Sequence, residues 1–147
     1  MSVDEEAIYK EPKDDKSILD DTFLYRRIIN QPNPPVKQIV WNYNENCWRP
    51  SSIAFSDHPD GSAMSVAIDD TLRQNSLAPE SVLNGHEGYS LAAFRAKSAR
   101  EKGLGVERKP LDNDLAHGEV FGKKTGSVKK HLADAAEWIV PPDLPKP

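Results

Sequence analysis

Short runs of β-branched and aromatic residues recur along the chain and predict strands. The runs are TFLYRRII (22–29), KQIVW (37–41), SSIAF (51–55), SAMSVAI (62–68), GYSLAAF (88–94), LGVERKP (104–110) and AHGEVF (116–121). The SDHPDGS segment between 51–55 and 62–68 predicts the turn of a β-hairpin, because proline presets φ and glycine accepts a positive φ. The polar NYNENCW segment predicts a loop that Trp48 anchors in the core.

One stretch near the C-terminus has the spacing of an amphipathic helix. Its apolar residues recur at i, i+4, i+7, i+8 and i+11: Val128, Leu132, Ala135, Ala136 and Ile139. This pattern predicts a helix over residues 127–139. A second helix is expected over 96–103, where Gly103 ends it. Short helical turns are expected after Asp69 and Asp70 and from Pro79.

The order of these elements favours an α+β fold. Two to four helices fall among about five to six short strands without a regular strand-helix-strand alternation, which predicts one compact domain with a mixed or antiparallel sheet. We expect this domain to span residues 22–140. Residues 1–21 predict an acidic and flexible arm. PPDLPKP (141–147) predicts a proline-rich tail, because proline fixes φ and lacks a backbone donor.

Composition places the protein among soluble globular chains. It has 147 residues, a net charge of −4 and 37% hydrophobic residues. Cys47 is the single cysteine, so an intrachain disulfide is excluded. No apolar run approaches the length that spans a bilayer, and the acidic N-terminus does not have the pattern of a secretory signal. We therefore expect a cytoplasmic protein, of bacterial origin.

Charge is segregated along the chain. Residues 1–21 hold eight acids against three lysines, a net −5, whereas residues 95–131 hold ten basic residues against five acids, a net +5. Opposite charges attract, so the acidic arm either lies on the basic half or each serves a different partner. The sequence does not favour nucleic acid as the partner of the basic half, because no known nucleic-acid motif is visible and the pI is near 5.6.

The segment AHGEVFGKKTGS (116–127) is the strongest candidate for chemistry. On a strand, His117 and Glu119 point to the same face, close enough to share a proton or a substrate. The alternative is an ordinary polar strand face. All four histidines have an acid within three residues, yet no metal-binding spacing such as HExxH occurs, and we expect no metal site.

The second half of that segment has the features of an anion site. The start of the following helix presents free N–H groups and the positive end of its dipole, so Lys123, Lys124, Gly126 and Ser127 are candidates for anion binding. The spacing of the glycines and lysines does not match a Walker phosphate loop. The alternative is a plain turn with solvated lysines.

Three residue types in order loosely resemble the Arg, Ser, Glu pattern of cholera-toxin-type ADP-ribosyltransferases: LYRRI, SSIAF and HGEV. The resemblance implies that Arg26 or Arg27 holds the NAD phosphates, that Ser52 braces the site and that Glu119 stabilises an oxocarbenium-like ribose. The sequence has Pro-Ser-Ser-Ile where the family has Ser-Thr-Ser, and His117 with Glu119 where the family has paired acids.

These observations lead to three functional hypotheses. The first is binding of a protein partner, with the acidic arm and the proline-rich tail as contact segments. The second is an enzyme that acts on NAD or another phosphate-bearing substrate through His117, Glu119, Arg27 (or Arg26) and Ser52. The third is nucleic-acid binding by residues 95–131. No cofactor is indicated by a motif.

Overall fold

The computed structural model describes residues 13–147, and its centre is one antiparallel sheet. The sheet has six strands in the order β6-β7-β4-β1-β5-β8. Their bounds are β1 Phe23–Ile29, β4 Met64–Ile68, β5 Tyr89–Arg95, β6 Gly105–Arg108, β7 His117–Phe121 and β8 Glu137–Val140. A separate hairpin pairs β2 (Ile39–Asn42) with β3 (Cys47–Pro50). The expected α+β class is confirmed, and the sheet is fully antiparallel.

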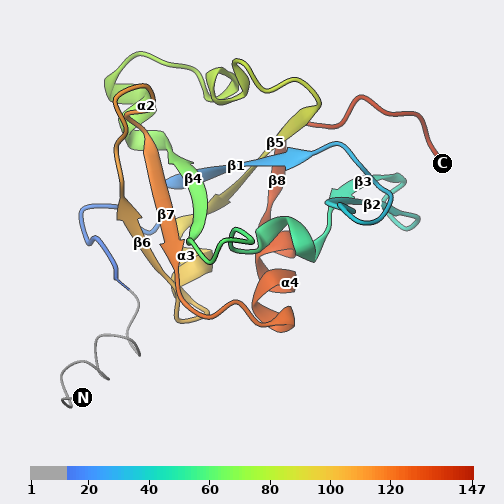
Figure 1. The fold of residues 1–147 in the computed structure, drawn as a ribbon, viewed down its shortest axis with the longest axis horizontal. Coiled ribbons are helices and arrows are strands. Elements are labelled where there is room, and N and C mark those ends of the chain that lie inside the picture. The colour runs from blue at the N-terminus through green and yellow to red at the C-terminus, as the bar shows by residue number, and fades with distance from the viewer. Residues whose placement is uncertain (1–12) are drawn as a thin grey trace.

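Helical segments cover both faces of the sheet. α2 (Asp69–Gln74) and the 3-10 turn η2 (Pro79–Leu83) pack on one face. α3 (Ala96–Arg100), α4 (Gly126–Ala135) and the 3-10 turn η1 (Ser52–Phe55) pack on the other. Figure 1 shows α2 and α4 on opposite sides of the strands. The larger apolar cluster lies on the α4 face, and a smaller one lies under α2 and η2.

Because side chains alternate along β1, this strand contributes residues to both apolar clusters. Leu24 and Ile28 belong to the cluster on the α4 face, whereas Tyr25 belongs to the cluster under α2. Successive side chains of a strand point to opposite faces, so Arg26 lies with the first set and Arg27 with the second. The neighbouring arginines therefore face different surroundings.

Three details differ from the sequence-based expectations. Residues 52–55 form a 3-10 turn and not a strand, so the expected hairpin with residues 62–68 is wrong. The hairpin that does form joins β2 to β3 and includes part of the expected NYNENCW loop. The C-terminal amphipathic helix is confirmed but ends at Ala135, because residues 137–140 pair with β5 as an edge strand.

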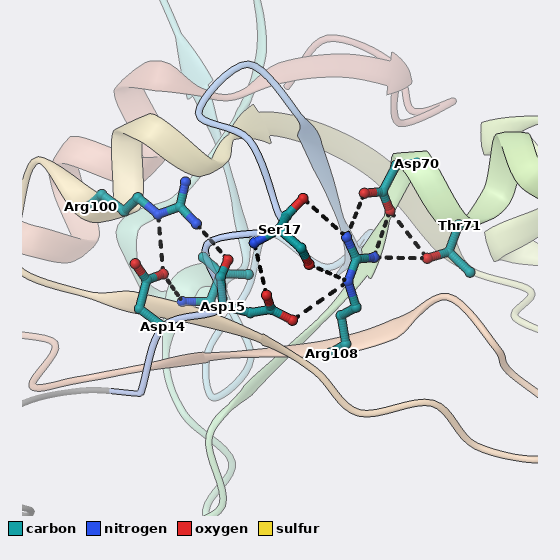
Figure 2. A network of polar contacts seen from close by, with 8 residues as sticks. Asp14, Asp15, Ser17, Asp70, Thr71, Arg100 and Arg108 are labelled. Carbon is teal, nitrogen blue, oxygen red and sulfur yellow. Dashed lines mark hydrogen bonds and ion pairs between the residues drawn. The ribbon is translucent and has the colours of Figure 1, made fainter.

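Part of the expected acidic arm packs on the domain. Residues 1–12 lie outside the described residues, but Ile18 is completely buried and belongs to the main core. Asp14 and Asp20 pair with Arg100, at 3.1 and 2.8 Å, and Asp15 lies 3.6 Å from Arg108. Both arginines come from the basic half, so this stretch of acids lies on it, as Figure 2 shows.

The backbone of residues 13–15 lies close to the backbone of β6, and this contact holds the acidic stretch in place. Asp15 N–H donates to the carbonyl of Val106 at 2.7 Å, and Val106 N–H donates to the Asp14 carboxylate at 3.0 Å. A Cβ atom at Gly105 would lie 1.9 Å from the carbonyl oxygen of Lys13. Only glycine fits here without a shift of the backbone. We call residues 13–21 the docked segment.

Candidate functional site

An open cleft of about 770 Å³ lies on the α2 face of the sheet. Its walls come from α2, from η2 with its flanking loops, and from the loop before β7. A small recess of about 20 Å³ adjoins it, and the two share the residues Arg27, Ser65, Val82, Asp114 and His117. The cleft is within the size range of small-molecule sites. It brings together two residues that the sequence singled out, Arg27 and His117.

Strand register explains how these residues meet. β4 lies between β1 and β7, with Tyr25 opposite Ala67 and Ala67 opposite His117. Arg27 is two residues beyond Tyr25, and alternation returns its side chain to the same face. The arginine and the histidine are 90 positions apart in the chain yet line one cleft.

Arg27 supplies a guanidinium whose charge no acid neutralises within the described residues. Its Nη1 donates to the carbonyl of Val82 at 3.1 Å, and no carboxylate lies within ion-pair distance in residues 13–147. A guanidinium has five N–H donors in a planar fork. Most of them are therefore available to a ligand, and the fork matches phosphate or carboxylate oxygens.

His117 is held in one orientation by a backbone contact. Its Nδ1 lies 2.8 Å from the carbonyl oxygen of Lys109. A carbonyl only accepts hydrogen bonds, so this contact favours the tautomer with the proton on Nδ1 and leaves a lone pair on Nε2. In that tautomer His117 is able to accept a proton or a hydrogen bond from a ligand.

The cleft also contains acids and apolar side chains. Asp112 and Asp114 line it, together with His58 and His86. Leu77, Leu111 and Leu115 line it as well and are about half exposed, at 49%, 48% and 55%. A bare anion would meet the two carboxylates as well as Arg27. The arrangement suits a ligand that combines an anionic group, hydrogen-bond donors and an apolar part.

Arg26 has a structural role on the opposite face. Its guanidinium donates to the carbonyls of Ala54 at 3.0 Å, Ser65 at 2.8 Å and Ser56 at 3.3 Å. Burial, and then the charge of Arg27, lower the pKa of Arg26 to about 10, so it stays charged at neutral pH. Arg26 thus ties η1 to the sheet, and the arginine of the pair that lines the cleft is Arg27.

Ser52 and Glu119 are not among the residues that line the cleft. Ser52 lies in η1, which packs against α4 on the other side of the sheet. Glu119 lies on the same strand face as His117 but one pair further along, opposite Ser65 and Glu107. Ser65 and Asp114 line the cleft in their place. No pattern in the sequence marks these two residues, because their position depends on strand register and on a loop.

The candidate anion residues lie just before α4 and in its first turn, and one of them is already engaged within the protein. The side chain of Lys124 is only 2% exposed, donates to the carbonyls of Val120 and Gly122, and pairs with Asp57 at 2.6 Å. It is therefore not a solvated lysine. Lys123, Gly126 and Ser127 are exposed, and Thr125 caps the helix by accepting a hydrogen bond from Val128 N–H at 3.3 Å.

Several cations of the basic half form ion pairs within the protein. Arg100, Arg108, Lys109, Lys124 and Lys130 each have an acidic partner. Arg108 forms a bidentate pair with Asp70, at 2.8 and 2.7 Å. These charges are compensated internally, which leaves less free positive charge on residues 95–131 than the sequence implies.

The fold and the cleft define the class of protein: an antiparallel α+β domain with a ligand-sized cleft on one sheet face. No family model, curated protein or solved structure matches the chain. Within residues 13–147, no helix is long and apolar enough to cross a membrane. No group of three or more metal-ligating side chains occurs in the same range.

Proposed function

We propose that the protein binds a phosphate-bearing ligand of the nucleotide type in the cleft on the α2 face. One observation carries the proposal: the Arg27 guanidinium lines a ligand-sized cleft without an acidic partner among the described residues, beside a histidine with a free ring nitrogen. A partly buried cation favours an anionic ligand, and arginine binds phosphate oxygens in pairs.

The other residues of the cleft support the rest of such a ligand. Asp114 is able to accept hydrogen bonds from sugar hydroxyls, as carboxylates do in other nucleotide sites. The three leucines at the cleft offer an apolar surface to a base or another ring. His117 contacts the ligand through Nε2, as a hydrogen-bond acceptor or a general base.

The test is a thermal-shift and calorimetric panel with inorganic phosphate, ATP, NAD and ADP-ribose at constant ionic strength. We expect at least one nucleotide to raise Tm by several degrees at a hundred times its Kd, which corresponds to about 2.7 kcal/mol. Arg27→Gln should weaken binding of that nucleotide about tenfold or more, because a charge-assisted hydrogen bond is lost. Asp114→Asn should weaken nucleotide binding, because an acceptor for the sugar hydroxyls is lost, and should strengthen phosphate binding, because a repulsive charge is removed.

A matched control is Arg95→Gln, which removes one positive charge from an exposed strand end away from the cleft. This variant should bind as the wild type does. If no nucleotide shifts Tm, or if Arg27→Gln and Arg95→Gln weaken binding equally, the cleft is not the site and the proposal is overturned.

Binding of a protein partner is the second candidate function. The observation that favours it is the proline-rich tail, which is largely exposed and held near two tryptophans by few contacts. The acids of the docked segment are already engaged within the domain, so they contribute less to a partner than the sequence suggests.

A further inference from the structure

The C-terminal tail lies on the β2–β3 hairpin. Trp48 Nε1 donates a hydrogen bond to the carbonyl of Pro145 at 3.3 Å. The ammonium group of Lys146 lies 5.8 Å from the centre of the Trp41 ring. The two indoles are paired opposite each other in the hairpin and meet edge to face at 5.3 Å. We call Trp41 and Trp48 the tryptophan pair.

These contacts have the chemistry of proline-rich recognition. Proline-rich segments prefer an extended conformation without internal hydrogen bonds, which leaves their carbonyls free to accept. Aromatic-lined grooves bind such segments, and the cost in conformational entropy is low because the segment is already extended. An indole N–H that donates to a proline carbonyl, with a lysine over the next ring, meets both requirements.

The surface beside the tryptophan pair extends beyond the tail. A hollow of about 580 Å³ is lined by Trp41 with Val40, Tyr43, Glu45 and Asp134, and none of residues 141–147 lines it. Tyr43 is 80% exposed and Val40 is 42% exposed. Both of its carboxylates already have cationic partners, since Glu45 lies 3.8 Å from Arg49, which also lines the hollow, and Asp134 pairs with Lys130 at 2.9 Å. The hollow thus offers apolar surface next to the ring that Lys146 contacts, and it suits a segment longer than the tail.

The protein's own tail is held loosely. Every residue of 141–147 except Pro142 is exposed, and none pairs as a strand. The indole N–H of Trp41 is covered and has no hydrogen-bond partner among residues 13–147, so within this range one buried donor is unsatisfied. A segment that satisfied this donor as well would have an advantage over the tail.

We propose that the tryptophan pair is a binding site for a proline-rich, lysine-bearing segment of a partner protein, and that the chain's own PPDLPKP tail occupies this site until the partner displaces it. The inference gives the second candidate function a site and a partner chemistry. It is independent of the nucleotide cleft, which lies on the α2 face of the sheet. A tethered competitor acts at a high effective concentration, so the tail lowers the apparent affinity of the site for other segments.

The experiment uses the full chain labelled with ¹⁵N and follows the indole N–H signals of its three tryptophans. The probe is a synthetic PPDLPKP peptide added in trans, and PPDLPEP is the control peptide. Lys146→Glu should move the Trp41 and Trp48 signals and should raise the affinity for the probe roughly fivefold or more, because the tethered competitor is weakened. PPDLPEP should bind more weakly than the probe.

Trp48→Phe in the Lys146→Glu background keeps an aromatic ring and removes the donor, so it should abolish probe binding. Trp138, whose indole donates to the carbonyl of Trp48 at 2.8 Å, reports whether the hairpin remains folded. The proposal is overturned if Lys146→Glu leaves the Trp48 signal in place, or if the probe moves neither signal in that variant. Concentration-dependent dimerisation of the wild type would also overturn it, because the occupant would then be the tail of a second copy.

Discussion

At the scale of single residues, Arg26 and Arg27 are adjacent on β1 but lie on opposite faces of the sheet and have different roles. Arg26 donates to three backbone carbonyls and is partly buried. Arg27 makes one hydrogen bond and lines the cleft. Neither arginine forms an ion pair with an acid within residues 13–147. The two positions should therefore respond differently to substitution.

Arg26→Met should lower the free energy of unfolding by about 2–4 kcal/mol, because three partly buried carbonyls lose a charged donor. Arg27→Met should lower it by less than about 1 kcal/mol, since only one hydrogen bond is lost. Urea unfolding of both variants measures the difference. Equal losses of stability would show that Arg27 also serves the fold and would weaken its assignment to ligand binding.

The sequence predicts individual site residues, but it does not predict which of them lie together in the fold. Arg27 and His117 were both proposed as site residues, and both line the cleft. Their meeting depends on the register of β1, β4 and β7, and a pattern of single residues does not encode a register. For the same reason Ser52 was expected beside them, although η1 places it on the other side of the sheet.

At the scale of elements, the runs of β-branched and aromatic residues predicted most strands of the large sheet. β1, β4, β6 and β7 lie within their expected ranges, and β5 extends one residue beyond its range, to Arg95. The SSIAF run was expected to be a strand, but its Ala54 and Phe55 are both buried as a 3-10 turn against the sheet. The helical stripe reached Ile139, yet the free edge of β5 recruits residues 137–140 as β8. Tertiary pairing overrode local propensity at both places.

Gly105 offers a test of how the docked segment is held. Gly105→Ala introduces a Cβ that would collide with the backbone of Lys13, so the segment or β6 must shift. We expect a loss of about 1–3 kcal/mol in the free energy of unfolding. We also expect faster hydrogen exchange at the amide of Asp15. Both are measured on the full chain.

Gly126→Ala is the matched control, because no atom lies within 4 Å of the added Cβ and the residue has no left-handed φ. It should leave stability within about 0.5 kcal/mol and Asp15 exchange unchanged. If Gly105→Ala behaves like this control, residues 13–21 do not depend on the close approach.

At the scale of the whole molecule, attraction between opposite charges of distant segments joins the docked segment to the sheet and α2. Arg108 pairs with Asp70 of α2 and reaches Asp15 and Ser17 of the docked segment (Figure 2). Arg100 of α3 pairs with Asp14 and with Asp20. The segregation of charge along the sequence predicted this attraction as one of two alternatives. It did not predict which acids take part.

These ion pairs give the stability a dependence on pH. Hydrogen bonds from Arg108 lower the pKa of Asp70. Burial opposes ionisation of Asp14, but hydrogen bonds from Lys16, Val106 N–H and Arg100 outweigh it, so its pKa is also lowered. Carboxyls with a depressed pKa stabilise the fold above the ordinary value near 3.9, and this stabilisation is lost as pH falls through the folded-state pKa.

We therefore expect the free energy of unfolding to be nearly constant from about pH 7 to 5 and to decline below about pH 4. Asp70→Asn should flatten this decline while lowering stability at pH 7 by about 1–2 kcal/mol. Urea titrations at half-unit steps of pH measure both. A decline of unchanged steepness in Asp70→Asn would contradict the role assigned to the Arg108 pair.

The contact between Asp14 and Val106 has a further consequence for how separate molecules behave. β6 is the outermost strand on its side of the sheet, and the carboxylate of Asp14 accepts the Val106 N–H that an added strand would otherwise bind. Because Asp15 N–H donates to the Val106 carbonyl, the docked segment occupies both the N–H and the carbonyl of Val106. Exposed strand edges recruit other chains and start fibrils. In this protein a few acidic residues near the N-terminus cover part of that edge. Their loss would favour polymerisation even if the domain stayed folded.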